Sequence, residues 1–526
     1  MNNQFFRIQF LIVQFVLLML ATPLSASDSG WWHDDVAGLQ ARLAAGEISA
    51  EAVVQAHLER IEALDGQIKA VLAVDPTALE QARALDKALA DGQPPGPLHG
   101  IPILLKDNIE TAAQPTTAGS LLLLENNTGR DAALAARLRN AGAVVLGKAN
   151  LSQWANFRST RSSSGWSSVG GQTRNPYDLS RSPCGSSSGS GAAVSAGFAL
   201  VAIGTETNGS IVCPASANGN AAIKPTVGLV SRTGIVPISQ HMDTAGPMAR
   251  RLADAVVVLA AMMGEDENDD ATRQRPEWQA EDLLAALDKT SLEGLRIGVL
   301  SDTSDYHPEV GHLLDLAIER LEAGGAKIVT DLAFDWPEGF GEDFMKVLLT
   351  DFKHDLNRYL AGLPDEQLSR MNLSRLIAFN RQHARSEMPW FGQELFEQAA
   401  EQGPVTDEEY LEALKRIQTA MREDGIDKLL AEHKLDALIA PTGGPAWTID
   451  LVNGDHFGGG SSTPAAVAGY PNITIPMGTI HGLPIGLSFF AGRYAEPQLI
   501  SIARAFEQAT EPLDPPDLDK GPAMKP

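Results

Sequence analysis

Two loops rich in glycine and serine, separated by one short apolar segment, constrain this chain more than any other feature of its sequence. The first loop is residues 185–191 (GSSSGSG), and the second is residues 204–210 (GTETNGS). Between them, residues 192–201 are rich in alanine and long enough for a short helix that leads into a strand. Loops of this composition bury little apolar surface and lose much backbone entropy when they become ordered. We therefore expect their backbone N–H groups and hydroxyls to serve a function.

The same stretch resembles the signature of the amidase signature family. That family usually carries a Gly-Gly-Ser-Ser-Gly-Gly-Ser loop, followed about two dozen residues later by an Asp-x-Gly-Gly-Ser loop. In this chain Ser186 and Ser210 are 24 positions apart. The resemblance covers residues 33–510 and is weaker over residues 265–435. Further motifs match the family in the same order: LLKDN at 104–108, IKPTVGLVS at 223–231, DTAGPM at 243–248, TPA at 463–465 and GYPNITIP at 469–476.

The chain departs from the family pattern at four positions. Cys184, Ser188 and Asn208 stand where glycine is usual, and Glu206 stands where aspartate is usual. The form GTETNGS is similar to that of the bacterial peptide amidases. Asn208 keeps a backbone N–H but adds a side chain, so this departure concerns the dihedral angles of the loop rather than the mechanism.

Hydrolysis of an amide needs a nucleophile, a base and a site that stabilises the oxyanion. A serine hydroxyl is a weak nucleophile until a neighbouring group takes its proton. The resemblance implies that Ser210 is the nucleophile, that Ser186 bridges it to Lys106, and that Lys106 is the base. Lys106 must then be neutral, which burial favours because it lowers the pKa of a lysine.

The resemblance also implies the groups that surround these three residues. It places a supporting hydrogen-bonding role on Ser187 and a cis peptide bond before Ser186. It implies an oxyanion hole formed by the backbone N–H groups of Thr207, Asn208, Gly209 and Ser210.

Three competing interpretations of the motifs are weaker. Residues 185–189 match the G-x-S-x-G nucleophile elbow, with Ser187 as nucleophile, but that motif must follow a strand, and the preceding residues 175–183 (NPYDLSRSP) cannot form one. Residues 142–148 match the phosphate-loop pattern, but its middle residues favour a strand and Ala149 replaces the magnesium-binding hydroxyl. His241 is near the site in sequence, but a lysine base does not need it, so we expect a structural histidine.

The N-terminus has the pattern of an export signal. Arg7 is the one charged residue among residues 1–26, residues 10–21 are nearly all apolar, and small residues follow at 25–27. We expect residues 1–26 to be a signal peptide and the mature chain to be periplasmic or secreted, without stable membrane association. The alternative is a retained membrane anchor.

The cysteines, the histidines and the net charge further limit the kinds of site and partner that this protein can have. Cys184 and Cys213 flank the two loops, and either a disulfide between them or two buried thiols fits the sequence. The eleven histidines show no metal-ligand spacing, so we expect no metal and no cofactor. The formal net charge of −25 argues against binding to nucleic acid or to an anionic membrane.

Segments that favour strands alternate with segments that favour helices, which predicts a layered α/β fold with a substantial sheet. The resemblance implies a single large domain over residues 33–510, with one mixed β-sheet covered by helices on both faces, and a C-terminal tail over 511–526. We expect a monomer. The predicted strands are 70–74, 101–105, 143–146, 295–300, 326–332, 435–440, 472–476 and 485–489. The predicted helices are 35–45, 50–64, one that begins with Pro76 as its first residue, 131–140, 252–262, 308–323, most of 340–435, and 498–509.

Three classes of function fit the resemblance. The first is an exported amidase that releases ammonia from C-terminal peptide amides, with aryl amides, fatty amides or esters as alternative substrates. The second is the glutamine-hydrolysing component of a tRNA-dependent amidotransferase, against which the export signal argues. The third is a non-catalytic relative, against which Lys106, Ser186 and Ser210 argue. Trp447, Phe457 and Tyr470 are either pocket residues or core residues.

Overall fold

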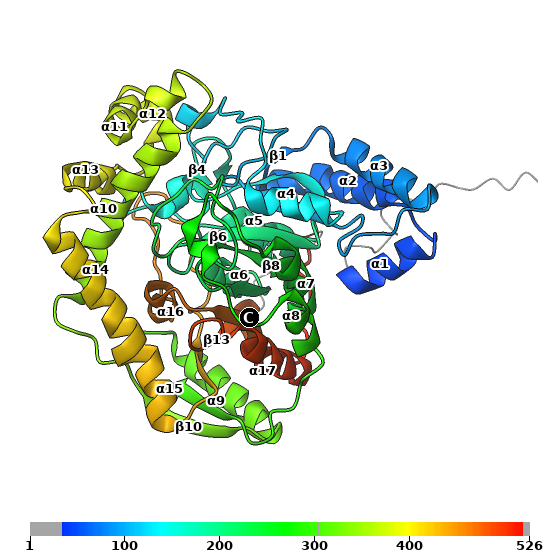
Figure 1. Cartoon of the computed structure of the whole chain (residues 1–526), viewed down its shortest axis with the longest axis vertical. Coiled ribbons are helices and arrows are strands. Elements are labelled where there is room, and N and C mark those ends of the chain that lie inside the picture. The colour runs from blue at the N-terminus through cyan, green and yellow to red at the C-terminus, as the bar shows by residue number, and fades with distance from the viewer. Residues whose placement is uncertain (1–33, 302–304, 519–526) are drawn as a thin grey trace, which may run out of the picture.

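One mixed sheet of eleven strands forms the centre of the molecule (Figure 1). The computed structural model describes residues 34–301 and 305–518, so the predicted signal peptide and the end of the tail lie outside the described residues. The strand order is β1-β3-β2-β6-β8-β7-β12-β13-β11-β9-β10. The strands are β1 (Val71–Val74), β2 (Pro102–Lys106), β3 (Val144–Ala149), β6 (Val201–Glu206), β7 (Ala221–Lys224), β8 (Thr244–Ala249), β9 (Arg296–Leu300), β10 (Lys327–Leu332), β11 (Ala437–Pro441), β12 (Asn472–Ile480) and β13 (Leu483–Phe490).

Two groups of parallel strands flank an antiparallel middle, and the edge strand β1 pairs with β3 in antiparallel fashion. Strand β2 is parallel to both β3 and β6, and β9 is parallel to both β10 and β11. Between these two parallel groups, β8, β7, β12 and β13 pair in antiparallel fashion. The mixed sheet that the resemblance implies is therefore confirmed. A separate two-stranded ribbon pairs β4 (Trp166–Ser167) with β5 (Gly171–Gln172) inside the long loop before the first glycine-rich segment.

Helices cover the sheet on both faces, and the alternation of residues along the strands explains how. In β7, Ala221 and Ile223 pack in the large core cluster, whereas Ala222 packs with Ile211 and Ala215 at the other face. The helices are α1 (Val36–Ala44), α2 (Ala50–Ile68), α3 (Ala78–Ala90), α4 (Ala133–Asn140), α5 (Ser188–Ser195), α6 (Val212–Ala217), α7 (Leu252–Met262), α8 (Ala280–Ala286), α9 (Pro308–Ala323), α10 (Phe340–Ala361), α11 (Leu373–Gln382), α12 (Ala384–Glu387), α13 (Glu394–Glu401), α14 (Glu408–Met421), α15 (Asp427–His433), α16 (Thr463–Ala468) and α17 (Glu496–Ala509).

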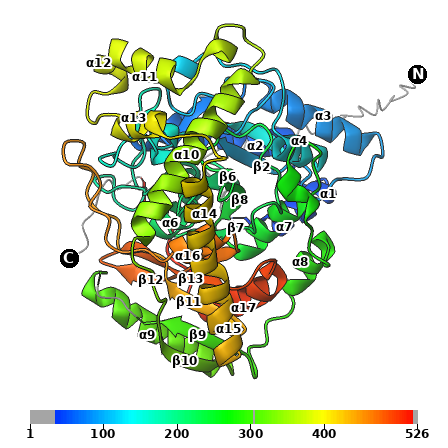
Figure 2. The same cartoon turned by 60° about the vertical axis from the view of Figure 1, so that its left-hand side comes forward.

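A second helical layer flanks the sheet. Figure 2 shows α10 and α14 side by side, and α14 also packs against the short helix α16. Apolar side chains from α10, α11, α13 and α14 share one core cluster, which includes Phe352, Phe396 and Ile417. The segment 340–435 is therefore mostly helical, as predicted. Among the described residues, no helix combines the length and apolar character needed to cross a bilayer.

The sequence-based boundaries agree with the structure best at two helices. Helices α7 and α9 begin and end at the predicted residues. The prediction for Pro76 was wrong, because the Asp75 carboxylate accepts hydrogen bonds from the N–H and hydroxyl of Thr77, and this turn delays α3 to Ala78. Strands β7 and β8 were not predicted.

Both glycine-rich segments are shorter as loops than the sequence suggests. Residues 188–191 form the first turn of α5, and residues 204–206 end β6. Small side chains allow this close packing: a Cβ on Gly189 would lie 2.3 Å from the Ala70 carbonyl oxygen, and one on Gly204 would lie 2.7 Å from Ser187 Oγ.

A disulfide joins Cys184 to Cys213, which decides between the two interpretations of the cysteines. The Cα atoms are 6.0 Å apart, and the bond links the segment before Gly185 to helix α6, which follows Ser210. The bond thus closes a loop that contains both glycine-rich segments, the helix α5 and the strand β6.

We expect the double variant Cys184→Ser/Cys213→Ser to lose about 2–4 kcal/mol of unfolding free energy, because the open chain gains entropy when unfolded. The measurement is the urea midpoint by circular dichroism, with the wild-type protein in strong reductant as the matched control. Equal midpoints for the variant and the oxidised wild type would contradict a structural role for the bond.

Candidate active site

Lys106 ends strand β2 and is fully buried. Its Nζ lies 2.7 Å from Ser186 Oγ, 2.8 Å from Thr205 Oγ1 and 3.1 Å from the Thr205 carbonyl oxygen. Because β2 and β6 are parallel neighbours, their carboxyl ends meet at one edge of the sheet, where Thr205 faces Lys106. Three oxygens therefore surround the amine, and each can accept a hydrogen bond from it.

Burial changes the proton affinity of this amine. The pKa of Lys106 is lowered to about 7, because loss of hydration disfavours the charged form, and the negative charges of Asp243 and Glu206 offset only part of that effect. A substantial fraction of Lys106 is therefore neutral near pH 7, and a neutral amine can accept a proton.

The Gly185–Ser186 peptide bond is cis, as the resemblance implies. Ser186 is buried against Lys106, and the next residue, Ser187, joins the two glycine-rich segments. Ser187 Oγ lies 3.1 Å from both the N–H and the carbonyl oxygen of Thr205, and the Ser187 N–H donates to the Ser210 carbonyl oxygen at 3.2 Å. These contacts bring Ser210, which is partly exposed, to the edge where Lys106 and Ser186 meet.

The segment 207–210 is fixed from two sides. Thr207 Oγ1 donates to Asp243 Oδ1 at 2.6 Å. The Asn208 side chain accepts from Ser462 Oγ at 2.7 Å and donates to Thr463 Oγ1 at 3.1 Å, at the start of α16. Within this segment only Gly209 has a positive φ, of 83°, so Asn208 fits without a left-handed backbone.

Glu206 anchors the residues that follow Ser210. Its Oε2 accepts the backbone N–H groups of Ile211 at 2.7 Å and Val212 at 3.0 Å, and the side chain is buried. The carboxylate therefore pairs N–H groups at the start of α6 that would otherwise be buried without partners. This contact explains how glutamate serves at a position where the family usually has aspartate.

A pocket of about 280 Å³ opens beside these segments. Gly185, Asn208 and Gly209 line it together with Trp447 and Phe457, whose rings are in edge contact. Phe457 is thus a pocket residue, and Trp447 both lines the pocket and packs in a small buried cluster with Cys184. Tyr470 is a core residue instead: it packs in the second core cluster, and its hydroxyl donates to Asp427 at 2.8 Å.

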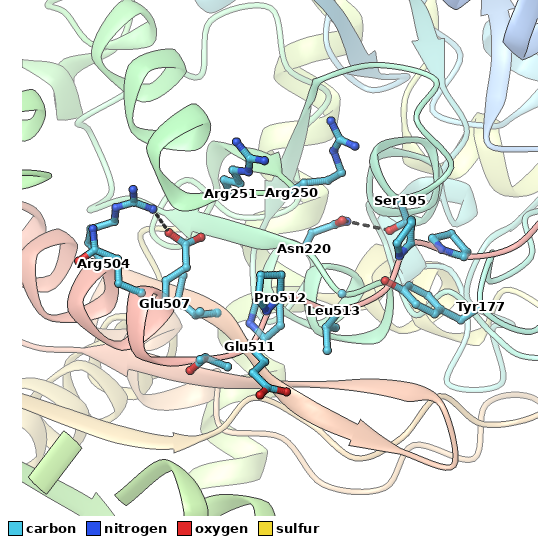
Figure 3. A pocket seen from close by; sticks show the side chains of 17 residues that line it. Tyr177, Ser195, Asn220, Arg250, Arg251, Arg504, Glu507, Glu511, Pro512 and Leu513 are labelled. Atoms are coloured by element: carbon cyan, nitrogen blue, oxygen red, sulfur yellow. Dashed lines mark hydrogen bonds and ion pairs between the residues drawn. The ribbon is translucent and has the colours of Figure 1, made fainter. Parts of the chain in front are cut away.

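A larger pocket, of about 500 Å³, lies elsewhere (Figure 3). Its lining includes Ser195 at the end of α5, Asn220 just before β7, and Arg504 of α17. None of the predicted site residues lines it, so we assign the chemistry to the smaller pocket despite its size.

The comparisons with known proteins agree with this geometry. A family model described as Amidase matches residues 52–500. The chain belongs to the amidase family. It is a hydrolase that acts on amide bonds.

Several relatives are similar over most of their length. The crystal structure of native peptide amidase from Stenotrophomonas maltophilia is 48% identical, with a TM-score of 0.88 over 93% of this chain and 99% of that one. A peptide amidase in complex with the competitive inhibitor chymostatin is 49% identical, with a TM-score of 0.89 over the same shares. A glutamyl-tRNA(Gln) amidotransferase component from Moorella thermoacetica is 37% identical over 88% of this chain and 94% of its own length.

The structure of this amidase adds residues that the sequence did not single out. Thr205 holds the amine of Lys106, Asn108 Nδ2 donates to Thr205 Oγ1 at 2.9 Å, and Asp243 holds Thr207. Asn108 and Asp243 stand inside matched motifs, which is the signal that could have found them. His241 is structural, with its Nε2 3.1 Å from the Tyr410 hydroxyl. Within residues 34–301 and 305–518, no three His, Cys, Asp or Glu side chains are arranged to hold a metal ion.

We expect Glu206→Ala to lower the unfolding free energy by about 2–4 kcal/mol, because it leaves two buried N–H groups without an acceptor. Glu206→Gln keeps an acceptor oxygen and should lose less than half as much. The measurement is urea unfolding of both variants and the wild type. If the two variants were equally stable, the carboxylate would not be anchoring these N–H groups.

Proposed function

We propose that this amidase hydrolyses carboxamide bonds with release of ammonia, and that C-terminal amides of peptides are its substrates. The observation that carries the proposal is the short contact between a buried lysine amine, with its pKa lowered to about 7, and Ser186 Oγ, beside Ser210. The similarity to peptide amidases at 48–49% identity supports the choice of substrate.

In the proposed reaction, Ser210 Oγ attacks the carbonyl carbon while its proton passes to Ser186, and the Ser186 proton passes to the neutral Lys106 amine. The negative charge that develops on the carbonyl oxygen is stabilised by backbone N–H groups of residues 207–210. When the C–N bond breaks, the proton returns from Lys106 through Ser186 to the leaving nitrogen, and ammonia departs. The acyl group stays on Ser210.

Water then attacks the acyl-enzyme through the same relay and releases the carboxylic acid. In this proposal, Thr205 orients the lysine amine, and Ser187 holds the two segments in register. Export of the mature chain, after cleavage near residue 26, is part of the proposal and gives the enzyme access to extracellular or periplasmic peptides.

A glutaminase activity is the second candidate, because glutamyl-tRNA(Gln) amidotransferase components are 33–37% identical to this chain. Free glutamine is itself a small primary amide, so the same relay could act on it. The two candidates differ in the substrate that releases ammonia without any partner protein.

We expect the purified mature chain to release ammonia from a short peptide amide, with Ser210→Ala reducing the rate at least about a thousandfold because the nucleophile is missing. The assay is coupled ammonia detection, with glutamine in parallel and circular dichroism to show that the variant is folded. Release from glutamine alone would favour the second candidate. Full activity of Ser210→Ala would remove Ser210 from the mechanism.

The lowered pKa of Lys106 predicts an acid limb in the pH profile. A base must be unprotonated to act, so kcat/KM should fall about tenfold per pH unit below pH 7 and level off above it. Lys106→Arg should be nearly inactive at every pH, because a guanidinium stays protonated. A flat profile between about pH 5 and 7, or an active Lys106→Arg variant, would exclude Lys106 as the base.

A further inference from the structure

Asp455 is the one formally charged residue among the described residues that line the active-site pocket. The rest of the lining is neutral: aromatic, aliphatic, hydroxyl-bearing, amide-bearing, glycine, or the disulfide itself. Asp455 belongs to the segment between β11 and α16, which also carries Trp447 and Phe457. A single charge in an otherwise neutral pocket acts on every substrate that enters it.

Neutral donors hold this carboxylate in place. Asp455 Oδ1 accepts from Trp447 Nε1 at 3.0 Å and from the Ser164 N–H at 3.0 Å, and Oδ2 shares that N–H at 3.1 Å. These donors fix the orientation of the carboxylate but do not cancel its charge. Each carboxylate oxygen has two lone pairs, so Oδ2 keeps capacity to accept a hydrogen bond besides those from Ser164.

Titratable neighbours compensate the charge of Asp455 only weakly. His456 follows it in sequence, and its ring lies 3.4 Å from Asp450 Oδ2, on the exposed side of the segment. Desolvation raises the pKa of Asp455 above its ordinary value, the hydrogen bonds from Ser164 and Trp447 oppose that rise, and His456 contributes least. The carboxylate is half-buried, so a charge brought beside it is screened less than at an open surface.

A second hydrogen-bond acceptor, the side-chain oxygen of Asn156, lies close to Ser164. Asn156 lines the pocket, its Nδ2 donates to Ser164 Oγ at 3.0 Å, and its Oδ1 is buried without a partner. Both Asn156 Nδ2 and Ser164 Oγ lie 3.1 Å from the position that a Cβ on Gly185 would take. Gly185, the residue before Ser186, thus lies beside Asn156 and Ser164, and the Ser164 N–H in turn donates to Asp455. Both acceptors therefore belong to the pocket that Gly185 lines.

We propose that Asp455, assisted by Asn156 Oδ1, is a specificity-determining residue that selects amides bearing a positively charged nitrogen close to the scissile bond. This inference rests on the proposed function. Two sources supply such a group: the α-ammonium of an unblocked amino-acid amide, and the side chain of a C-terminal lysine or arginine amide. Anionic substrates, and the carboxylate product itself, are disfavoured by the same charge.

Three ligands built on the same linear four-carbon side chain separate these sources. N-acetyl-norleucinamide carries no charge, norleucinamide carries only the α-ammonium, and N-acetyl-lysinamide carries only the side-chain ammonium. Calorimetric titration into the Ser210→Ala variant near pH 7 measures binding without turnover, and kcat/KM of the wild type for the same ligands measures selection during reaction.

We expect at least one of the two cationic ligands to bind about three- to tenfold more tightly than the neutral one, as for a partly buried ion pair. Adding Asp455→Asn should bring this ratio to about one, because the amide oxygen still accepts from Trp447 and Ser164 but carries no charge. Which of the two ligands gains identifies the position of the recognised nitrogen.

Asp450→Asn is the matched control. Asp450 lies in the same segment and loses the same charge, but it bonds Asn453 and the Val452 N–H and does not line the pocket. The ratio of cationic to neutral ligand affinity in this control should equal that of the Ser210→Ala parent. A parent ratio of one, a preference that survives Asp455→Asn, an equal effect of Asp450→Asn, or no binding of any ligand would each overturn the inference. Absence of ammonia release by the wild type would instead count against the proposed function, since the titration needs no turnover.

Discussion

The buried amine of Lys106 is the constraint on which the rest of the active site depends. An ammonium group without water is costly unless every N–H finds an acceptor. The parallel pairing of β2 with β6 supplies that environment, since it places the Thr205 carbonyl and hydroxyl oxygens beside the amine, and the Ser186 hydroxyl completes it. The three acceptors make the charged form tolerable, while burial keeps its pKa near 7. The amine can thus gain and lose a proton without a large rearrangement of its surroundings.

This environment requires the two glycine-rich segments to keep fixed positions relative to each other. The hydrogen bonds of Ser187 to Thr205 and Ser210 hold the two segments together. The disulfide between Cys184 and Cys213 joins the residues that flank them. Glycines permit the approach, because side chains at 189 and 204 would collide with neighbouring atoms. The glycine and serine content that makes these segments look flexible in the sequence is therefore what allows them to be packed tightly.

The sequence predicted the elements of the fold better than the contacts of the site. Helix α9 could be predicted to the residue, because its apolar period and Pro308 define it locally. Strand β7 escaped prediction because it has only four residues, and β8 escaped because Gly246 and Pro247 argue against a strand interior, so its stability comes from neighbours in the sheet. Lys106, Ser186 and Ser210 were named only through the family resemblance. The contact of Asn108 with Thr205 spans 97 residues, and no local pattern reports such a contact.

Chemistry and selectivity occupy different parts of this molecule. The groups around Lys106 belong to the ends of sheet strands and to segments packed against them, so a change there disturbs the core. The wall that carries Trp447, Asp455 and Phe457 lies between β11 and α16, outside the sheet. It contacts the segments of the relay through the bonds of Asn208 to Ser462 and Thr463 and through the bond of Ser164 to Asp455. A wall attached in this way can change its charge and shape while the relay stays intact. Similarity of the whole chain to a relative therefore supports a shared reaction more strongly than a shared substrate. The choice of substrate depends on the residues of the pocket wall.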